Sequence, residues 1–285
     1  MRVILVPVAD RPECVHALNT AFSLARQLGS NVVGCHIRPH AYSEVALPAG
    51  LDAYAEYDVA WEAVWSGKKA SPGSAEAKVL YARMAEDNGF SMIAKPRREA
   101  GAVWMEKAGS PDRILAIEGP VSDLVVVSRP AQGGGTVARV VLMAALLNSS
   151  KPVLVLPHSR PSVTGKRIAI AWNQSPEAAR AVTAALPLLQ LAEQVSIITS
   201  GRETKPGPKS SQLANYLRFW GIDSKRVTVR KAHDAQSILD GYRSSKSDLL
   251  VMGAYSTSRL RQRMFGGVTQ FMLQHADIPV FMLHT

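Results

Sequence analysis

Short runs of apolar and β-branched residues alternate along the chain with longer stretches of helical periodicity. The second half shows this most clearly: residues 167–172 predict a strand, and Ser175 predicts the N-cap of a helix over 176–190. Further strands are predicted at 195–199, 227–231, 248–252 and 279–283, with helices at 210–220, 235–243 and 268–275. Continuous Val, Ile and Leu runs are typical of strands buried on both faces. The pattern therefore predicts an α/β fold with a doubly wound, five-stranded parallel sheet.

The first half repeats this pattern. RVILVP at 2–7 recurs as RIAIAW at 167–172 with an offset of 165, SDLVVV at 122–127 as SDLLVM at 247–252, and PVLVL at 152–156 as PVFML at 279–283. These matches predict two tandem domains, residues 1–160 and 166–285, joined by a short linker. The first is longer because residues 40–73, rich in Ala, Tyr, Trp, Gly and Ser, interrupt the alternation. We interpret this segment as an insertion.

Composition and charge make some classes of function more plausible than others. The chain is 47% apolar and 20% charged, and no apolar run approaches the roughly 18 residues of a spanning helix. Its first residues read as a strand rather than a signal, so we expect a cytoplasmic protein that does not enter a membrane. Residues 166–285 carry 16 Lys and Arg against 8 Asp and Glu, whereas residues 1–165 carry 17 against 15. The second half therefore favours an anionic partner, although we do not expect nucleic acid because no groove-reading helix or aromatic-basic pattern is visible.

The strongest candidate chemistry follows the fourth predicted strand of the second half. Gly253 ends that strand, and Gly-Gly-Val-Thr at 266–269 opens the next helix. Glycine permits close approach of backbone to a ligand, and a helix start attracts phosphate through its free N–H groups. Arg259, Arg261 and Arg263 add positive charge with no acid between them. The segment predicts a phosphate cradle where ligands bind in doubly wound sheets; a tight turn with solvated arginines is the alternative.

These residues resemble the C-terminal signature of the universal stress protein (UspA) family. The family pattern is Gly, two residues, Gly, nine residues, Gly-Ser/Thr and then a Pro-Val strand, to which Gly253, Ser256, the 266–269 run and Pro279-Val280 correspond. Asn173-Gln174-Ser175 resembles the family's Asp-x-Ser after the first strand. The resemblance covers nearly the whole chain as two tandem copies. It implies a Rossmann-like fold, a role in stress responses, ATP binding, intrachain pairing of the two domains and a possible homodimer.

The resemblance also implies which residues bind the nucleotide, ATP or another adenine nucleotide, with or without Mg²⁺. The base and ribose would contact Ala171, Trp172, Asn173 and Ile198, and the phosphates would contact Gly253, Tyr255, Ser256, Arg263, Gly266, Gly267, Val268 and Thr269. Three positions depart from the family: Asn173 replaces Asp, Ser256 replaces the second Gly, and Gly267 replaces Ser/Thr.

The first half has lost this signature. Ser128 and Ala131 occupy the two Gly positions, and Arg139-Val140 falls where Gly-Ser/Thr belongs. Asp10 is displaced by one residue from the position of the family's Asp. We therefore predict no ATP site in the first half, which would act as a structural partner or bind something else beside the insertion.

No motif for catalysis accompanies the cradle. The sequence has no Gly-x-Ser-x-Gly elbow, no Walker A motif and no paired carboxylates beside residue 266. Cys14, Cys35 and the histidines show no metal-ligand spacing. We therefore predict no catalytic residue, no protein metal site and at most slow ATP hydrolysis. Two functions remain open: a nucleotide-binding stress module, or a nucleotide-free scaffold with two degenerate sites.

Overall fold

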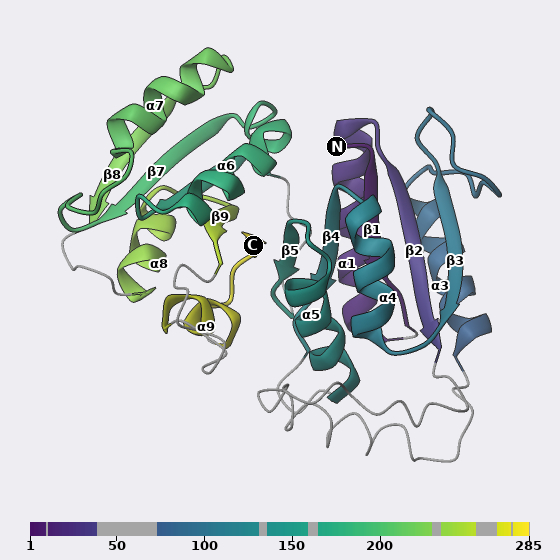
Figure 1. The fold of residues 1–285 in the computed structure, drawn as a ribbon. Coiled ribbons are helices and arrows are strands. Elements are labelled where there is room, and N and C mark those ends of the chain that lie inside the picture. The colour runs from purple at the N-terminus through teal and green to yellow at the C-terminus, as the bar shows by residue number, and fades with distance from the viewer. Residues whose placement is uncertain are drawn as a thin grey trace.

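Strands and helices alternate through both halves of the computed structural model (Figure 1), which describes residues 1–9, 11–38, 73–130, 136–158, 165–229, 235–254, 267–274 and 276–284. The first half contains β1 (Val3–Pro7), α1 (Pro12–Leu28), β2 (Asn31–Arg38), α3 (Ser74–Asp87), β3 (Ala102–Ala108), α4 (Pro111–Glu118), the 3-10 helix η2 (Gly119–Val121), β4 (Leu124–Ser128), α5 (Thr136–Asn148) and β5 (Val153–Leu156). The second half contains β6 (Arg167–Trp172), α6 (Pro176–Leu189), β7 (Gln194–Ser200), α7 (Ser210–Phe219), β8 (Ser224–Val229), α8 (Ala235–Ser244), β9 (Leu249–Gly253), α9 (Gly267–Gln274) and β10 (Val280–Leu283).

The strands form one 10-stranded sheet in the order β3-β2-β1-β4-β5-β10-β9-β6-β7-β8. All neighbouring strands are parallel except β5 and β10, which pair antiparallel where the two halves meet. Within each half the first strand lies between the second and the fourth, so the winding reverses there. The predicted doubly wound α/β fold with five strands from each half is confirmed.

Helices cover both faces of the sheet (Figure 1). Helices α1, α3, α6 and α7 pack their apolar sides on one face, and α4, α5, α8 and α9 pack on the other. The inner strands are therefore buried from both sides, which is why they read in the sequence as continuous apolar runs.

Most of the predicted elements of the second half lie within one or two residues of the observed ones. Ser175 caps α6, since its Oγ accepts a hydrogen bond from the N–H of Ala178 at 3.1 Å. Gly221, with φ of +72°, follows the end of α7. The exception is β8, predicted at 227–231 but observed at Ser224–Val229. This strand lies at the edge of the sheet and begins with polar residues, so its start does not read as a buried run.

The sheet register corrects the repeat alignment of the first strands. Ile4 pairs with Leu124 in the first half, and Ile168 pairs with Leu249 in the second. Because Leu124 and Leu249 correspond, Ile4 corresponds to Ile168, and the offset is 164 rather than the predicted 165. A slip of one residue moves every side chain of a strand to the opposite face of the sheet. Only the corrected offset therefore places the corresponding side chains of β1 and β6 on the same face.

One aspartate at the start of the fourth strand has the same role in each half. Oδ2 of Asp123 accepts hydrogen bonds from the backbone N–H groups of Arg2 and Val3, at 2.5 and 3.0 Å. The carboxylate of Asp248 accepts from the N–H groups of Lys166 and Arg167, both at 3.1 Å. The recurring Ser-Asp dipeptide therefore aligns the first and fourth strands of both halves at the corrected offset.

Two predicted segments lie outside the described residues. The insertion predicted at 40–73 falls almost entirely within residues 39–72, and most of the linker falls within 159–164. Among the described helices, none combines the length and apolar character that crossing a membrane requires.

Candidate functional site

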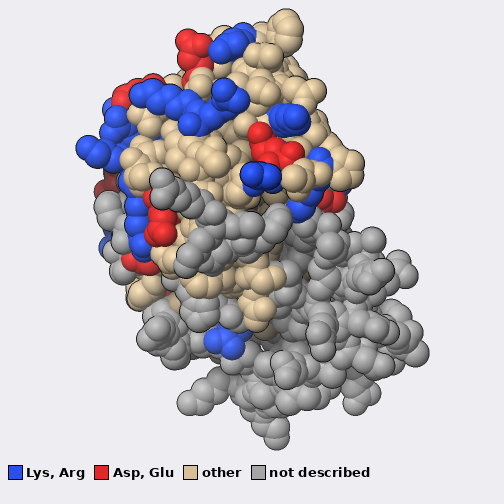
Figure 2. Space-filling view, turned by 90° about the vertical axis from the view of Figure 1, so that its left-hand side faces the viewer, with Lys and Arg blue, Asp and Glu red and all other residues tan. Residues whose placement is uncertain are grey.

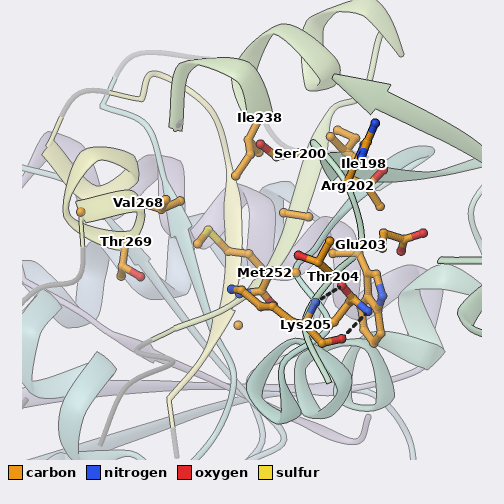
Figure 3. A pocket seen from close by; sticks show the side chains of 17 residues that line it. Ile198, Ser200, Arg202, Glu203, Thr204, Lys205, Ile238, Met252, Val268 and Thr269 are labelled. Carbon is orange, nitrogen blue, oxygen red and sulfur yellow. Dashed lines mark hydrogen bonds between the residues drawn. The ribbon is translucent and has the colours of Figure 1, made fainter. Parts of the chain in front are cut away.

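A cavity of about 210 Å³ lies at the carboxyl ends of β6, β7 and β9, beside the start of α9 (Figure 3). β6 and β9 are the adjacent strands at which the winding of the second half reverses. Its apolar walls come from Ala171, Ile198, Ile238 and Met252. Doubly wound sheets bind ligands at this place, so the cavity is the candidate site of the second half.

The structure brings together all of the predicted site residues that it describes. Those that line the cavity are Ala171, Trp172, Asn173, Ile198, Gly253, Gly267, Val268 and Thr269. The other predicted site residues, Tyr255, Ser256, Arg263 and Gly266, lie outside the described residues, as do Arg259 and Arg261. Residues more than 90 positions apart in the sequence therefore share one cavity.

Trp172 and Gln174 hold the loop between β7 and α7 against the end of β6. The indole Nε1 of Trp172 donates to the carbonyl oxygen of Pro208 at 2.8 Å. The buried Gln174 donates from Nε2 to the carbonyl oxygens of Lys205 and Gly207, both at 3.0 Å, and accepts from the N–H of Lys205 at 3.2 Å. These bonds fix the backbone of one wall of the cavity.

A glycine makes this contact sterically possible. A Cβ on Gly207 would lie 2.2 Å from the backbone oxygen of Gln174, a distance that no side chain tolerates. Gln174 itself has a φ of +63°, which costs a residue with a Cβ roughly 1–2 kcal/mol. The three side-chain hydrogen bonds of Gln174 offset that strain.

The structure assigns Gly253 a packing role that the sequence does not reveal. A Cβ at this position would lie 2.6 Å from both the backbone nitrogen of Ala178 and the carbonyl carbon of Glu177. The close approach that requires glycine is therefore between β9 and the first turn of α6. Gly253 still lines the cavity, but ligand approach is not needed to explain it.

The start of α9 forms the wall opposite the β7–α7 loop. Gly267 is exposed, and a Cβ built on it would meet nothing within 4 Å. Thr269, in the first turn of the helix, is only 6% exposed. The first N–H groups of a helix have no partner within the helix, so this end presents hydrogen-bond donors beside the cavity.

Asn173 and Ser175 shape the turn between β6 and α6. Oδ1 of Asn173 accepts from the backbone N–H of Ser175 at 3.2 Å, and the side chain is exposed. The amide thus performs the local bond that an aspartate would also form, without its negative charge.

The end of β7 and the loop that follows it were not predicted to contribute to the site. Six lining residues come from this region: Thr199, Ser200, Arg202, Glu203, Thr204 and Lys205. The predicted topology could have indicated these residues, because β7 ends at the same edge of the sheet as β6 and β9. Gln174, Ile238 and Met252 were also missed: Gln174 is the variable position of the Asn-Gln-Ser segment, and Ile238 and Met252 belong to no recognisable motif.

Glu203 is the single carboxylate among the described residues that line the cavity, and it caps a helix. Oε1 accepts from the backbone N–H of Ser210 at 2.5 Å, and Oε2 accepts from Oγ of Ser210 at 3.0 Å. Both oxygens are therefore engaged at the start of α7.

The corresponding region of the first half differs from the candidate site, and two of the differences fall on predicted site positions that are described. At the corrected offset, Ala9 stands where the second half has Asn173, and Ser128 stands where it has Gly253. Ser128 is buried, and its Oγ has no hydrogen-bond partner among the described residues. Asp10 and Ala131 lie outside the described residues.

The fold and the crevice define this chain as a tandem, doubly wound α/β protein with a ligand-sized cavity in its second half. Residues 165–284 match the model of the universal stress protein family. Over the full length, the chain is similar to a universal stress protein from Archaeoglobus fulgidus, with 16% identity, a TM-score of 0.67 and coverage of 99% of this chain and 97% of that one. A Pseudomonas aeruginosa protein provisionally assigned to the same family gives 15% identity, a TM-score of 0.58 and coverage of 99% and 93%. A comparison with curated proteins gives no match.

Residues 165–284 therefore carry a universal stress protein domain, and the whole chain has the fold of the solved universal stress protein that it resembles. The predicted family is confirmed.

Proposed function

We propose that this chain is a tandem universal stress protein that binds an adenine nucleotide, ATP in the first instance, in the crevice of its second half. One observation carries the proposal: those residues expected for base, ribose and phosphates that the structure describes line a single cavity at the point where the winding reverses. The proposed role is a cytoplasmic binding or signalling module in stress responses.

The cavity supports this assignment chemically. Its apolar side, with Ala171, Ile198 and Ile238, suits an adenine ring, and the start of α9 offers N–H donors to phosphate. Any Mg²⁺ would be held by the phosphates and water, because the described residues contain no group of three or more His, Cys, Asp and Glu that could hold a metal ion. Both oxygens of Glu203 already accept hydrogen bonds from Ser210. We therefore propose binding without rapid hydrolysis.

Calorimetric titration of the full chain with ATP and Mg²⁺ tests the proposal. We expect one nucleotide bound per chain, with a dissociation constant on the order of micromolar, equivalent to about 8 kcal/mol. Two nucleotides per chain would contradict the assignment of the first half as a structural partner. No heat with ATP, ADP or AMP, confirmed by equilibrium dialysis, would overturn the proposal.

A second candidate function, a scaffold that recruits a protein partner, is favoured by an exposed apolar surface at the end of α7. Phe219 is 90% exposed, and Tyr216 and Trp220 beside it are 37% and 45% exposed. Monomeric proteins rarely expose such clusters without function. Figure 2 shows many Lys and Arg side chains, interspersed with Asp and Glu, on the face of the molecule that it presents. An absence of nucleotide binding would make this surface the leading site.

We further propose that the two halves act as one paired unit in solution. The guanidinium of Arg129, at the end of β4, is 8% exposed and donates to the carbonyl oxygens of Ala276 and Ile278 in the second half, to the latter at 3.2 Å. Burial lowers the pKa of Arg129 to about 10, and Asp277 opposes this shift. A buried charge of this kind stabilises the contact between the two halves only while both carbonyl oxygens accept hydrogen bonds from it.

Replacing Arg129 with methionine tests this pairing. The change leaves two carbonyl oxygens without their donors, so we expect the free energy of unfolding in urea to fall by about 2 kcal/mol. Arg139→Met, at an exposed position in the same half, is the matched control and should change it by less than about 0.5 kcal/mol. Equal effects of the two variants would contradict the proposed role of Arg129.

A further inference from the structure

The candidate cavity has a cationic wall that the expected nucleotide signature does not explain. Arg202 and Lys205 line the cavity from the loop that follows β7 (Figure 3). Val268 and Thr269 of α9 lie on the other side of the same cavity. The start of α9, which offers N–H donors, and two exposed cationic residues therefore border the same cavity.

The position of these cations in the fold is informative. β7 is the strand reached by the first crossover after β6, and it pairs with β6 on the side away from β9. In doubly wound nucleotide-binding domains, the end of this strand lies beside the ribose hydroxyls. A free carboxylate there accepts a hydrogen bond from the 2′-hydroxyl, whereas an arginine accommodates a 2′-phosphate.

The carboxylate at this strand end is not free. Both oxygens of Glu203 accept hydrogen bonds from Ser210, at 2.5 and 3.0 Å. Glu203 therefore caps α7 instead of accepting from a ribose hydroxyl. Within the part of the chain that the structure describes, no ion pair engages the side chain of Arg202 or Lys205.

The loop that carries the two cations is fixed on the protein. The N–H and the carbonyl of Lys205 are both bonded to the side chain of Gln174, and the carbonyl of Pro208 accepts from Trp172. Gly201, with φ of +73°, turns the chain between the end of β7 and Arg202. The backbone therefore holds Arg202 and Lys205 at the rim of the cavity before any ligand arrives.

We infer that the ligand is an adenine nucleotide that carries a second phosphate on its ribose, at the 2′ or 3′ oxygen, and that Arg202 and Lys205 bind this phosphate. The inference rests on the proposed nucleotide site and specifies its ligand. The 5′-phosphate lies at the start of α9, and the ribose phosphate receives charge-assisted hydrogen bonds from the two side chains. ATP, whose ribose oxygens are neutral hydroxyls, leaves both cations without an anionic partner.

Three isomeric ligands test the inference: ADP, adenosine 2′,5′-bisphosphate and adenosine 3′,5′-bisphosphate. They contain the same atoms, but near pH 7 each bisphosphate carries about one more negative charge than ADP, because both of its phosphates are monoesters. General attraction to the basic second half therefore favours both bisphosphates over ADP and does not distinguish one bisphosphate from the other. We expect one of the bisphosphates to bind the full chain at least about tenfold more tightly than ADP. The two bisphosphates distinguish a 2′-phosphate from a 3′-phosphate.

Variants assign the effect to the two side chains. Arg202→Met with Lys205→Met should remove the advantage of the bisphosphate over ADP. Lys209→Met, which changes an exposed lysine of the same loop that does not line the cavity, should retain the advantage. Unfolding curves of all variants establish that the fold is intact.

Two results would overturn the inference, and they differ in what else they overturn. If ADP binds as tightly as both bisphosphates, or if the double variant keeps the preference, the second phosphate site is wrong while the nucleotide site stands. If neither ATP, ADP nor a bisphosphate binds, the proposed function fails together with the inference.

Discussion

Replacing Gly253 with valine will lower the free energy of unfolding by about 3 kcal/mol. The new Cβ would lie 2.6 Å from backbone atoms of Glu177 and Ala178, in the first turn of α6. Neither partner can retreat easily, because Ser175 caps that turn and β9 pairs with β6 and β10 on its two sides. A backbone contact of this kind cannot be relieved by a rotamer change.

Urea unfolding followed by circular dichroism measures this effect. Gly267→Ala is the matched control, because a Cβ at Gly267 meets nothing within 4 Å, and it should leave the free energy of unfolding within about 0.5 kcal/mol of the wild type. A loss of less than about 1 kcal/mol for Gly253→Val would show that β9 and α6 are not packed as closely as described.

Replacing Gly267 with glutamate will weaken ATP binding by roughly 100-fold. The new carboxylate would stand at the first residue of α9, beside the expected phosphates. Two unit charges 4 Å apart near a protein surface interact by about 4 kcal/mol, and about 2.7 kcal/mol already corresponds to a 100-fold change. An acid in the first turn of a helix stabilises the helix by roughly 0.3–1 kcal/mol, so the loss of binding is separable from unfolding.

Gly267→Ser provides the control for this variant. Serine restores the hydroxyl that the family resemblance implies at this position, without charge, and should bind ATP at least as tightly as the wild type. Calorimetric titration of the three proteins gives the comparison. ATP binding that is equal in the glutamate and serine variants would place the phosphates away from α9.

The fold could be predicted because its strands are buried on both faces and separated by capped helices. Ser175 marked the start of α6 through local chemistry that the structure confirms. The register of the first strand could not be predicted as well, since the run from Val3 to Pro7 has no polar residue to distinguish its faces. The start of β8 was missed because a strand at the edge of the sheet mixes polar and apolar residues.

The candidate site was predictable only where it follows a local motif. Gly253 and the 267–269 segment carry a pattern of fixed spacing, and the residues of this pattern that are described line the cavity. The loop bearing Arg202 and Lys205 is positioned by Trp172 and Gln174 from 31 to 36 residues away in the sequence. No pattern of neighbouring residues reveals such hydrogen bonds. The packing that requires glycine at position 253 could not be predicted either, because the atoms that it contacts belong to the backbone of α6.

Hydrogen–deuterium exchange of the full chain, with and without saturating ATP, tests most directly whether the nucleotide lies in the crevice of the second half. The account predicts slower exchange in peptides covering residues 171–175, 198–205 and 267–269, and unchanged exchange at 5–9 and 126–129 in the first half. Protection of the first-half peptides, or bound ATP without protection of the three second-half segments, would contradict it.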